Sequence, residues 1–370
     1  FYQSSVCLQS SSYICQRPLN LALALKKEIM MSAHIWSKKE EIESLTMERP
    51  HLVILGAGAS YASFPNGDKN GKKLPLMSNF VQILGLEELL EENNIHAPYN
   101  DFEALYSDIT VDETKQGLKE EIEKRIQNYF YSLELPDSPT LYDHLVLSLR
   151  PKDVIATFNW DPFLAQAIMR NISIIEKPPT ILFLHGNVTY AYCAECKVGY
   201  PLKDKCIECG EPLLSAPLLY PVKEKNYQTH PVIKAHWKGF EHYLKQAWAV
   251  TIFGYSAPKT DVEAIDIMKK AWGETEKRNL EQIEIIDIQE EKRLIETWSP
   301  FIHTHHYDVH RSFYESIIAK FPRRSGEALW AQLMECKWLD SQGFPQDANF
   351  SELYRNIIPK LEVEYRKQKS

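Results

Sequence analysis

The amino-acid sequence predicts an α/β fold in which helices cover a parallel β-sheet. Short segments rich in β-branched and aromatic residues alternate along the chain with longer segments of helical pattern. Each short segment is followed by glycine or polar residues, as at the carboxyl end of a buried strand. A tight cluster of four cysteines interrupts this alternation and predicts a small metal-binding insertion. With 370 residues, the chain is long enough for one such domain with insertions.

Five segments fit the strand pattern. They are residues 51–56 (HLVILG), 153–158 (DVIATF), 181–185 (ILFLH), 247–254 (AWAVTIFG) and 283–288 (IEIIDI). In open parallel sheets, ligands bind outside the carboxyl ends of the strands. Because all five segments end in polar or glycine residues, we expect one shared site at that edge of the sheet.

The start of the chain does not fit the α/β pattern. The apolar stretch at residues 21–25 is followed by Lys26, which is the wrong order for a secretory signal, and the first methionines are Met30 and Met31. We expect residues 1–46 to be an N-terminal extension, of which the leading ~30 residues are not part of the fold. Whether the leading ~30 residues belong to the natural protein is left open.

Two further stretches are predicted to be helical. Residues 65–150 form an insert between the first two strands, where apolar side chains recur every fourth residue at Leu118, Ile122, Ile126 and Phe130. This insert is either a helical lid or ordinary packing. Residues 306–370 form a C-terminal helical segment with a structural or oligomer-forming role. Its candidate buried side chains are Trp330, Leu333, Trp338, Tyr354 and Ile358.

Composition excludes several classes of protein. The 50 acidic and 42 basic side chains give a net charge of −8, so no direct nucleic-acid binding is expected. No apolar run approaches the ~20 residues of a membrane-spanning helix, which excludes an integral membrane protein. The seven cysteines do not form a secreted disulfide framework, and a cytoplasmic location is therefore predicted.

The cysteine cluster has the spacing of a zinc ribbon. Cys193 and Cys196 form one Cys-x-x-Cys pair, and Cys206 and Cys209 form a second one before Gly210. Four thiolates on one zinc ion close its coordination sphere, so the predicted zinc is structural. Two redox dithiols or a nucleic-acid-binding knuckle are the alternatives, and the mixed charges around the cluster do not favour the knuckle.

A glycine-rich turn follows the first predicted strand. Gly56, Ala57, Gly58 and Ser60 could bring backbone amides close to a pyrophosphate at a helix start. The signal is weak alone, because Tyr61 stands where a dinucleotide fingerprint has its third glycine. A plain tight turn is the alternative.

Polar side chains also follow the next two strands. Asn159 and Asp161 are two residues apart after the second strand, on the same side of an extended chain. His185 ends the third strand, directly before the zinc ribbon. A single histidine there is usually structural, but here it is expected at the same sheet edge as an amide and a carboxylate.

In the order and content of its motifs, the sequence resembles the sirtuin family. The blocks are residues 56–60 (GAGAS), 157–161 (TFNWD), 184–186 (LHG), the ribbon at 193–209, and 254–256 (GYS). The resemblance spans about residues 51–290 and implies a Rossmann-like NAD-binding domain at 47–305, with the ribbon at 187–215. It also implies cleavage of the bond between nicotinamide and ribose.

The resemblance assigns roles to the residues that match. It implies NAD-binding by Gly56, Ala57, Gly58 and Ser60 at the diphosphate, by Gly254, Ser256 and Asp287 at the adenosine half, and by Thr157 within its block. Asn159 would hold the nicotinamide ribose or a water, and Asp161 would contact the carboxamide. His185 would be the general base. An imidazole suits that role, because it titrates near working pH.

Two departures separate this chain from deacylating sirtuins. The segment after the glycine turn (SFPNGDK, residues 63–69) lacks the family's arginine. The strand that grips an acyl-lysine peptide is replaced by residues 216–223 (APLLYPVK). In these features the sequence is similar to divergent prokaryotic sirtuin-like proteins of antiphage defence, which hydrolyse NAD to ADP-ribose and nicotinamide.

The leading hypothesis is therefore an NAD+ glycohydrolase. An NAD-dependent protein-lysine deacylase and a non-enzymatic sensor of NAD or ADP-ribose are the alternatives. Because a free NAD hydrolase would drain its own cell, we expect an assembly switch, with a homo-oligomer and a partner protein from a defence operon as hypotheses.

Overall fold

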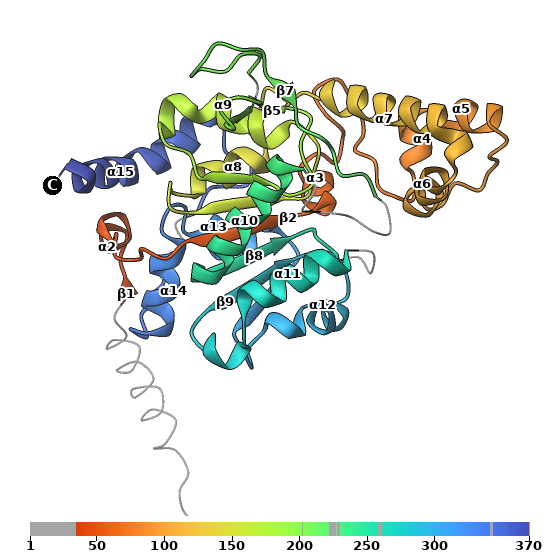
Figure 1. The fold of residues 1–370 in the computed structure, drawn as a ribbon. Helices are drawn as coiled ribbons and strands as arrows, with labels where there is room; N and C mark the ends of the chain where they lie inside the picture. The colour runs from red at the N-terminus through yellow and green to blue at the C-terminus, as the bar shows by residue number, and fades with distance from the viewer. Residues whose placement is uncertain are drawn as a thin grey trace, which may run out of the picture.

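The centre of the molecule is a six-stranded parallel β-sheet with helices on both faces (Figure 1). This computed structural model describes residues 35–201, 203–221, 227, 230–257, 261–340 and 343–369. The order of the strands is β10-β9-β8-β2-β3-β4, and every neighbouring pair is parallel. The strands are β2 (His51–Leu55), β3 (Val154–Thr157), β4 (Thr180–Phe183), β8 (Ala249–Phe253), β9 (Gln282–Ile286) and β10 (Tyr307–His310).

Five of these strands are the ones that the sequence predicted, and the predicted parallel sheet is confirmed. The sixth strand, β10, was missed. It lies at the edge of the sheet within the segment that was expected to be helical, and its residues are only partly buried. A half-exposed edge strand lacks the continuous apolar run of a central strand, so the pattern used for the others could not find it.

Helices cover both faces of the sheet over apolar cores, and others lie beside it. They are α2 (Lys38–Glu43), α3 (Ala57–Ser63), α4 (Phe80–Leu84), α5 (Glu87–Glu92), α6 (Phe102–Val111), α7 (Gln116–Tyr131), α8 (Leu141–Ser148), α9 (Phe163–Ile175), α10 (Pro231–Gln246), α11 (Val262–Trp272), α12 (Glu291–Trp298), α13 (Ile317–Lys320), α14 (Ser325–Leu333) and α15 (Phe350–Lys369). No helix among the residues described here is both long and apolar enough to cross a membrane.

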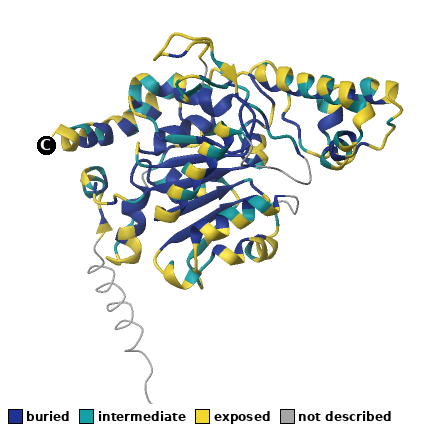
Figure 2. Cartoon of the chain, viewed as in Figure 1, coloured by how far each residue is buried: buried dark blue, intermediate teal, exposed yellow. Residues whose placement is uncertain are grey.

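Alternate residues of β2 belong to different cores. Leu52 and Ile54 pack with α10, α11 and α12, whereas Val53 and Leu55 pack with α8, α9, α13 and α15. All four side chains are buried, and Figure 2 shows the strands as the buried centre between partly exposed helices. A sheet covered on both faces explains why these strands read as continuous apolar runs.

The insert between β2 and β3 has two parts. Helices α4 to α7 project beside the sheet as an arm (Figure 1), and the four apolar residues predicted to line one helix face are buried on α7. Helix α8 instead packs against α9 on the sheet. The insert expected at residues 65–150 therefore contributes both an arm and a core helix.

The predicted N-terminal extension includes folded residues. Trp36 is buried, and Ser37 caps α2 with a reciprocal bond to Glu40. Strand β1 (Ile35–Trp36) pairs in parallel with β11 (Trp338–Leu339). Residues 35–46 of the predicted extension thus belong to the fold, and the leading residues, for which the prediction was made, lie within the stretch 1–34 outside the described part of the chain.

Most predictions of buried side chains in the C-terminal segment were wrong. Trp338 is 73% exposed, and Trp330, Leu333 and Ile358 are also exposed, while Tyr354 is half-buried. Helix α15 instead buries a face that carries Leu353, Ile357 and Leu361. Residue type alone does not say which face of a helix meets the core, whereas the four-residue spacing of these three does.

Candidate active site

A cavity of about 660 Å³ lies at the carboxyl ends of β2, β3, β8 and β9. This volume is typical of small-molecule and cofactor sites. The cavity is lined by nearly all of the predicted site residues, namely Gly56, Ala57, Gly58, Ser60, Asn159, Asp161, His185, Gly254, Ser256 and Asp287. Thr157 does not line it. The strand ends thus meet at one site, as parallel strands dictate.

Three glycines allow two loops to touch at one end of this cavity. The Gly58 amide donates to the Gly254 carbonyl at 3.0 Å, and the Gly56 amide donates to the Phe253 carbonyl at the same distance. A Cβ on Gly56 would lie 2.4 Å from the Gly254 oxygen. Gly254 has φ +62°, and its Cβ would lie 2.2 Å from the Ala59 nitrogen. No larger side chain fits at this crossing.

Asn159 is held by the strand end and by the glycine turn. Its side-chain Nδ2 donates to the Gly56 carbonyl at 2.8 Å and to Ser60 Oγ at 2.9 Å. Its backbone amide donates to Thr157 Oγ1 at 3.0 Å. Thr157 is therefore a support beneath the site, which explains why it does not line the cavity.

Asp161 is a buried carboxylate whose hydrogen-bond donors are uncharged. Its Oδ2 accepts from Ser60 Oγ at 2.6 Å, and its Oδ1 accepts from the Phe163 amide at 3.3 Å. Burial raises the pKa of Asp161 to about 6, although these hydrogen bonds oppose the shift. The Ser60 hydroxyl thus faces Asp161 and Asn159. It does not face the glycine-rich turn that was expected to bind a diphosphate.

His185 is buried beside aromatic rings. Its Nε2 lies 3.2 Å from the Tyr227 hydroxyl, and the two rings are stacked with centroids 5.8 Å apart. Phe158 meets the imidazole edge-on at 4.8 Å. Tyr227 is fully buried, so its ring closes one side of His185.

The far end of the cavity lies where β9 ends. The Asp287 Oδ1 accepts from the Gln289 amide at 2.9 Å, which holds this turn in shape. Arg311 follows β10, lines the same end, and donates to the backbone carbonyls of Asp287 and Gln289. The structure thus places Asp287 away from the strand ends that carry Asn159 and His185.

The predicted zinc ribbon folds as a separate three-stranded antiparallel sheet after β4. Its strands are β5 (Tyr190–Tyr192), β6 (Gly199–Pro201) and β7 (Leu214–Ser215). The Sγ atoms of Cys193, Cys196, Cys206 and Cys209 all lie within 4.8 Å of one another. Gly210 has φ +80°, as the turn after the last cysteine requires. This donor set fits one structural zinc ion.

Three contacts to the site were missed from the sequence. Asn187 donates from Nδ2 to the Asp161 carbonyl at 2.7 Å and so fixes the loop after β3. Tyr142 of α8 lies 2.6 Å from Ser60 Oγ, and Tyr227 meets His185. Asn187 follows the LHG block directly and could have been suspected, whereas the two tyrosines come from distant segments without a motif.

Comparisons with known proteins add a likeness to solved structures. No protein-family model matches the chain, and no curated protein matches it. A Sir2 structure with an inhibitor, 2′-O-acetyl-ADP-ribose and a deacetylated p53 peptide is 13% identical, with 78% of this chain and 94% of that chain covered and a TM-score of 0.33. A Sir2 homologue–NAD complex is 14% identical, with 80% and 96% covered and a TM-score of 0.34. The chain is thus similar to Sir2 structures over most of its length, at low identity.

Proposed function

We propose that this chain is an NAD+-cleaving enzyme, and specifically an NAD+ glycohydrolase that releases nicotinamide and ADP-ribose. The observation that carries the proposal is the meeting of Asn159, Asp161 and His185 at one cavity. The glycine crossing at Gly56 and Gly254 lines the same cavity, at the carboxyl ends of parallel strands where dinucleotides bind in such sheets.

The residue types suit cleavage of the bond between nicotinamide and ribose. As this C–N bond breaks, positive charge develops on the ribose, and water adds to the same carbon and loses a proton. The Asn159 carbonyl oxygen can hold a ribose hydroxyl or the water, and Asp161 can accept from the carboxamide N–H. His185 can take the proton of the water as general base. Burial of all three strengthens these interactions.

Water, rather than an acyl-lysine peptide, is the proposed acceptor of the ADP-ribosyl group. The reason is that the segment after β7 contacts the site itself. The Leu219 amide donates to the His185 carbonyl at 2.8 Å, and Leu219 and Pro221 line the cavity. From residue 216 to residue 221 the described chain lies outside any strand. Tyr227 covers His185 from a further side.

A deacylase is the second candidate, and one observation favours it. The cavity continues into an apolar part lined by Leu74, Leu76, Met77, Phe80 and Phe130. The acyl group of a modified lysine is apolar and would be compatible with such a wall. The assay must therefore include acylated peptides.

The test is nicotinamide release by the purified chain, followed by chromatography with NAD+ alone and with acyl-lysine peptides. We expect release without peptide, and a loss of at least ~100-fold in kcat in Asn159→Ala and in His185→Ala. His242→Ala is the matched control, because His242 is an exposed residue of α10 that contacts Gln246. Release that occurs only with peptide would establish the deacylase instead.

A measurement of ligand binding distinguishes the sensor hypothesis from the two enzyme hypotheses. If the wild-type chain binds NAD+ or ADP-ribose by calorimetry but never releases nicotinamide, the enzyme proposals fail and the sensor is supported. A role in antiphage defence, a cytoplasmic location, a homo-oligomer and an operon partner stay predictions. The oligomer is tested by light scattering together with activity at rising protein concentration.

A further inference from the structure

The Ser60 hydroxyl is the centre of a buried hydrogen-bond network behind the proposed reaction site. It lies 2.6 Å from Asp161 Oδ2, 2.6 Å from the Tyr142 hydroxyl and 2.9 Å from Asn159 Nδ2. All four residues are at most 8% exposed. Ser60 therefore has three protein partners and one hydrogen to donate.

The direction of each bond follows from the chemistry of the partners. An ionised carboxylate only accepts, so the Ser60 hydrogen goes to Asp161. The Ser60 oxygen must then accept from the other two partners. Burial raises the pKa of Tyr142 far above the working range, so its hydroxyl keeps its proton and donates to Ser60.

The network also decides which end of the Asn159 amide faces the cavity. Nδ2 has two hydrogens: one goes to the Gly56 carbonyl, and the other is directed to Ser60 Oγ at 2.9 Å, with the Tyr142 hydroxyl at a longer 3.4 Å. The carbonyl Oδ1 is then the part of the amide left for a ligand at the cavity that Asn159 lines. In the opposite orientation, Ser60 and Gly56 would both face an oxygen and two bonds would be lost.

Tyr142 is rigidly held on α8, which begins with a capping box of Thr140 and Asp143. Asp143 also accepts from Arg170 and Asn171. The Tyr142 ring packs at 6.0 Å from Phe64. These contacts leave the Tyr142 side chain little freedom to move, so its hydroxyl stays within hydrogen-bond distance of Ser60.

We infer that Tyr142 is a positioning residue for the proposed cleavage: its hydroxyl donates to Ser60, which directs Ser60 to Asp161 and the Asn159 oxygen to the substrate. Tyr142 does not line the cavity, so it acts through Ser60 rather than by touching NAD+. The inference rests on the proposed function for its kinetic consequence, but the orientation of Asn159 can be measured without turnover.

The kinetic test compares Tyr142→Phe, Ser60→Ala and the double variant with the wild-type chain. Phenylalanine keeps the ring and removes only the donor. We expect kcat for nicotinamide release to fall about tenfold in Tyr142→Phe, with KM within about threefold. Most of the loss caused by Tyr142→Phe should be absent in the Ser60→Ala background, because the short contact of Tyr142 is with Ser60 and its direct contact with Asn159 Nδ2 is long, at 3.4 Å. Tyr106→Phe is the matched control, since Tyr106 is also buried and donates to Glu123 away from the cavity.

The second readout is hydrogen exchange of the Asn159 side-chain amide, followed by NMR with labelled asparagine and assigned through Asn159→Ala. Exchange should be about tenfold faster in Tyr142→Phe than in the wild type and unchanged in Tyr106→Phe. Unchanged exchange, or an active chain whose Tyr142→Phe variant keeps its kcat or loses it additively with Ser60→Ala, overturns the inference. A wild-type chain that never cleaves NAD+ but shows the exchange effect refutes the proposed function and leaves the positioning role supported.

Discussion

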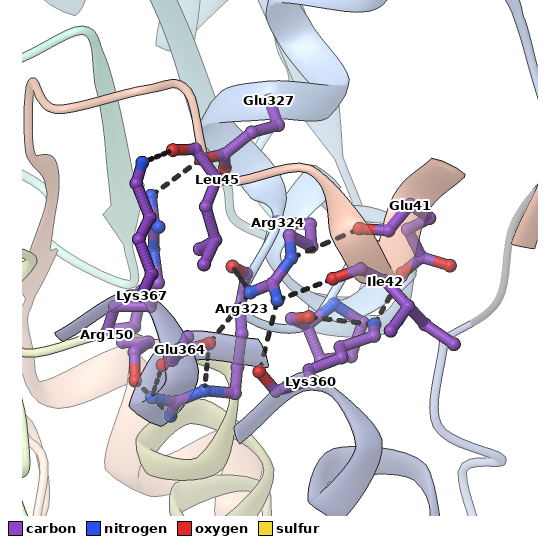
Figure 3. Close-up of polar contacts among 12 residues, drawn as sticks. Glu41, Ile42, Leu45, Arg150, Arg323, Arg324, Glu327, Lys360, Glu364 and Lys367 are labelled. Atoms are coloured by element: carbon purple, nitrogen blue, oxygen red, sulfur yellow. Dashed lines mark hydrogen bonds and ion pairs between the residues drawn. The ribbon is translucent and has the colours of Figure 1, made fainter. Parts of the chain in front are cut away.

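Two buried polar networks in this molecule are built in opposite ways. The network of Ser60, Tyr142, Asn159 and Asp161 has a single carboxylate with uncharged partners. The network that joins the two ends of the described chain consists of ion pairs, shown in Figure 3. Its members are Glu41 of α2, Arg323 and Arg324 before α14, and Lys360 and Glu364 of α15.

The ion-pair network links three segments of the chain through two buried carboxylates, Glu41 and Glu364. Arg323 and Arg324 both pair with Glu364, and Lys360 pairs with Glu41. Arg324 also donates to the backbone carbonyls of Glu41 and Ile42 (Figure 3). Burial pushes the pKa of Glu364 upward, but the bonds and charges of the two arginines outweigh it, so the net pKa lies below its ordinary value.

The two networks differ in role: the ion-pair network stabilises the fold, and the Ser60 network lies at the proposed reaction site. Glu364 pairs with two arginines and does not line the cavity, so it holds α15 to the segment before α14. Asp161 borders the cavity, and its pKa is raised to about 6 because burial is not balanced by a cation. A destabilised carboxylate at a cavity is typical of functional sites. Changes in the two networks should therefore affect different measurements.

The largest expected effect is on stability, from Glu364→Ala. This change leaves Arg323 and Arg324 buried without their carboxylate, and removing one partner of such a pair costs about 3–5 kcal/mol. Urea denaturation measures the loss, while nicotinamide release per folded molecule should stay at the wild-type level. If the variant does not fold, the isosteric Glu364→Gln, which keeps hydrogen-bond acceptance, replaces it. An unchanged unfolding midpoint would contradict the fastening role.

The next largest effect comes from Asp161→Asn. In contrast to Glu364→Ala, this change should raise stability and lower activity. Below pH 4 the carboxyl is protonated in both states, and between its ordinary pKa of 3.8 and about 6 the folded chain binds the extra proton. Stability contributed by the protonated form is therefore lost as pH rises through 6. At pH 7 we expect the variant to be more stable than the wild type by up to about 3 kcal/mol, with kcat lowered at least ~100-fold.

The measurement is the difference in unfolding free energy between Asp161→Asn and the wild type from pH 4 to pH 7. It should be small at pH 4 and grow toward pH 7. A variant less stable than the wild type at pH 7 would show that Asp161 fastens the fold as Glu364 does, and the distinction between the two networks would be lost.

The two networks also differ in how far the sequence reveals them. Ser60, Asn159 and Asp161 lie in short motifs at strand ends, and parallel topology brings such ends together. Tyr142 comes from a helix of the insert, and the packing of α8 against α9, α13 and α15 brings its hydroxyl to the site. A motif search cannot see that contact, because nothing in the local pattern distinguishes Tyr142 from a core tyrosine.

None of the ion-pair network was predicted. Buried Lys360 and Glu364 look like the exposed charges of any helix, and their burial depends on partners more than 35 residues away in sequence. Trp338 is likewise exposed, although the size of its side chain alone suggested burial. Periodicity identified strands and helices here because it is local, whereas charge pairing across α2, α14 and α15 is not.

The smallest expected effect is on stability, from Arg366→Ala, and it compares an exposed with a buried ion pair between α2 and α15. Arg366 of α15 pairs with Glu43 of α2 at 3.3 Å, but the two side chains are 69% and 54% exposed. Water and salt screen such a pair, so Arg366→Ala should cost less than about 1 kcal/mol by urea denaturation, and the cost should shrink in high salt. The same two helices then carry the buried pair of Lys360 with Glu41 and a nearly neutral exposed pair. A loss as large as that of Glu364→Ala would mean that the contact between the helices, rather than the burial of charge, determines the stability.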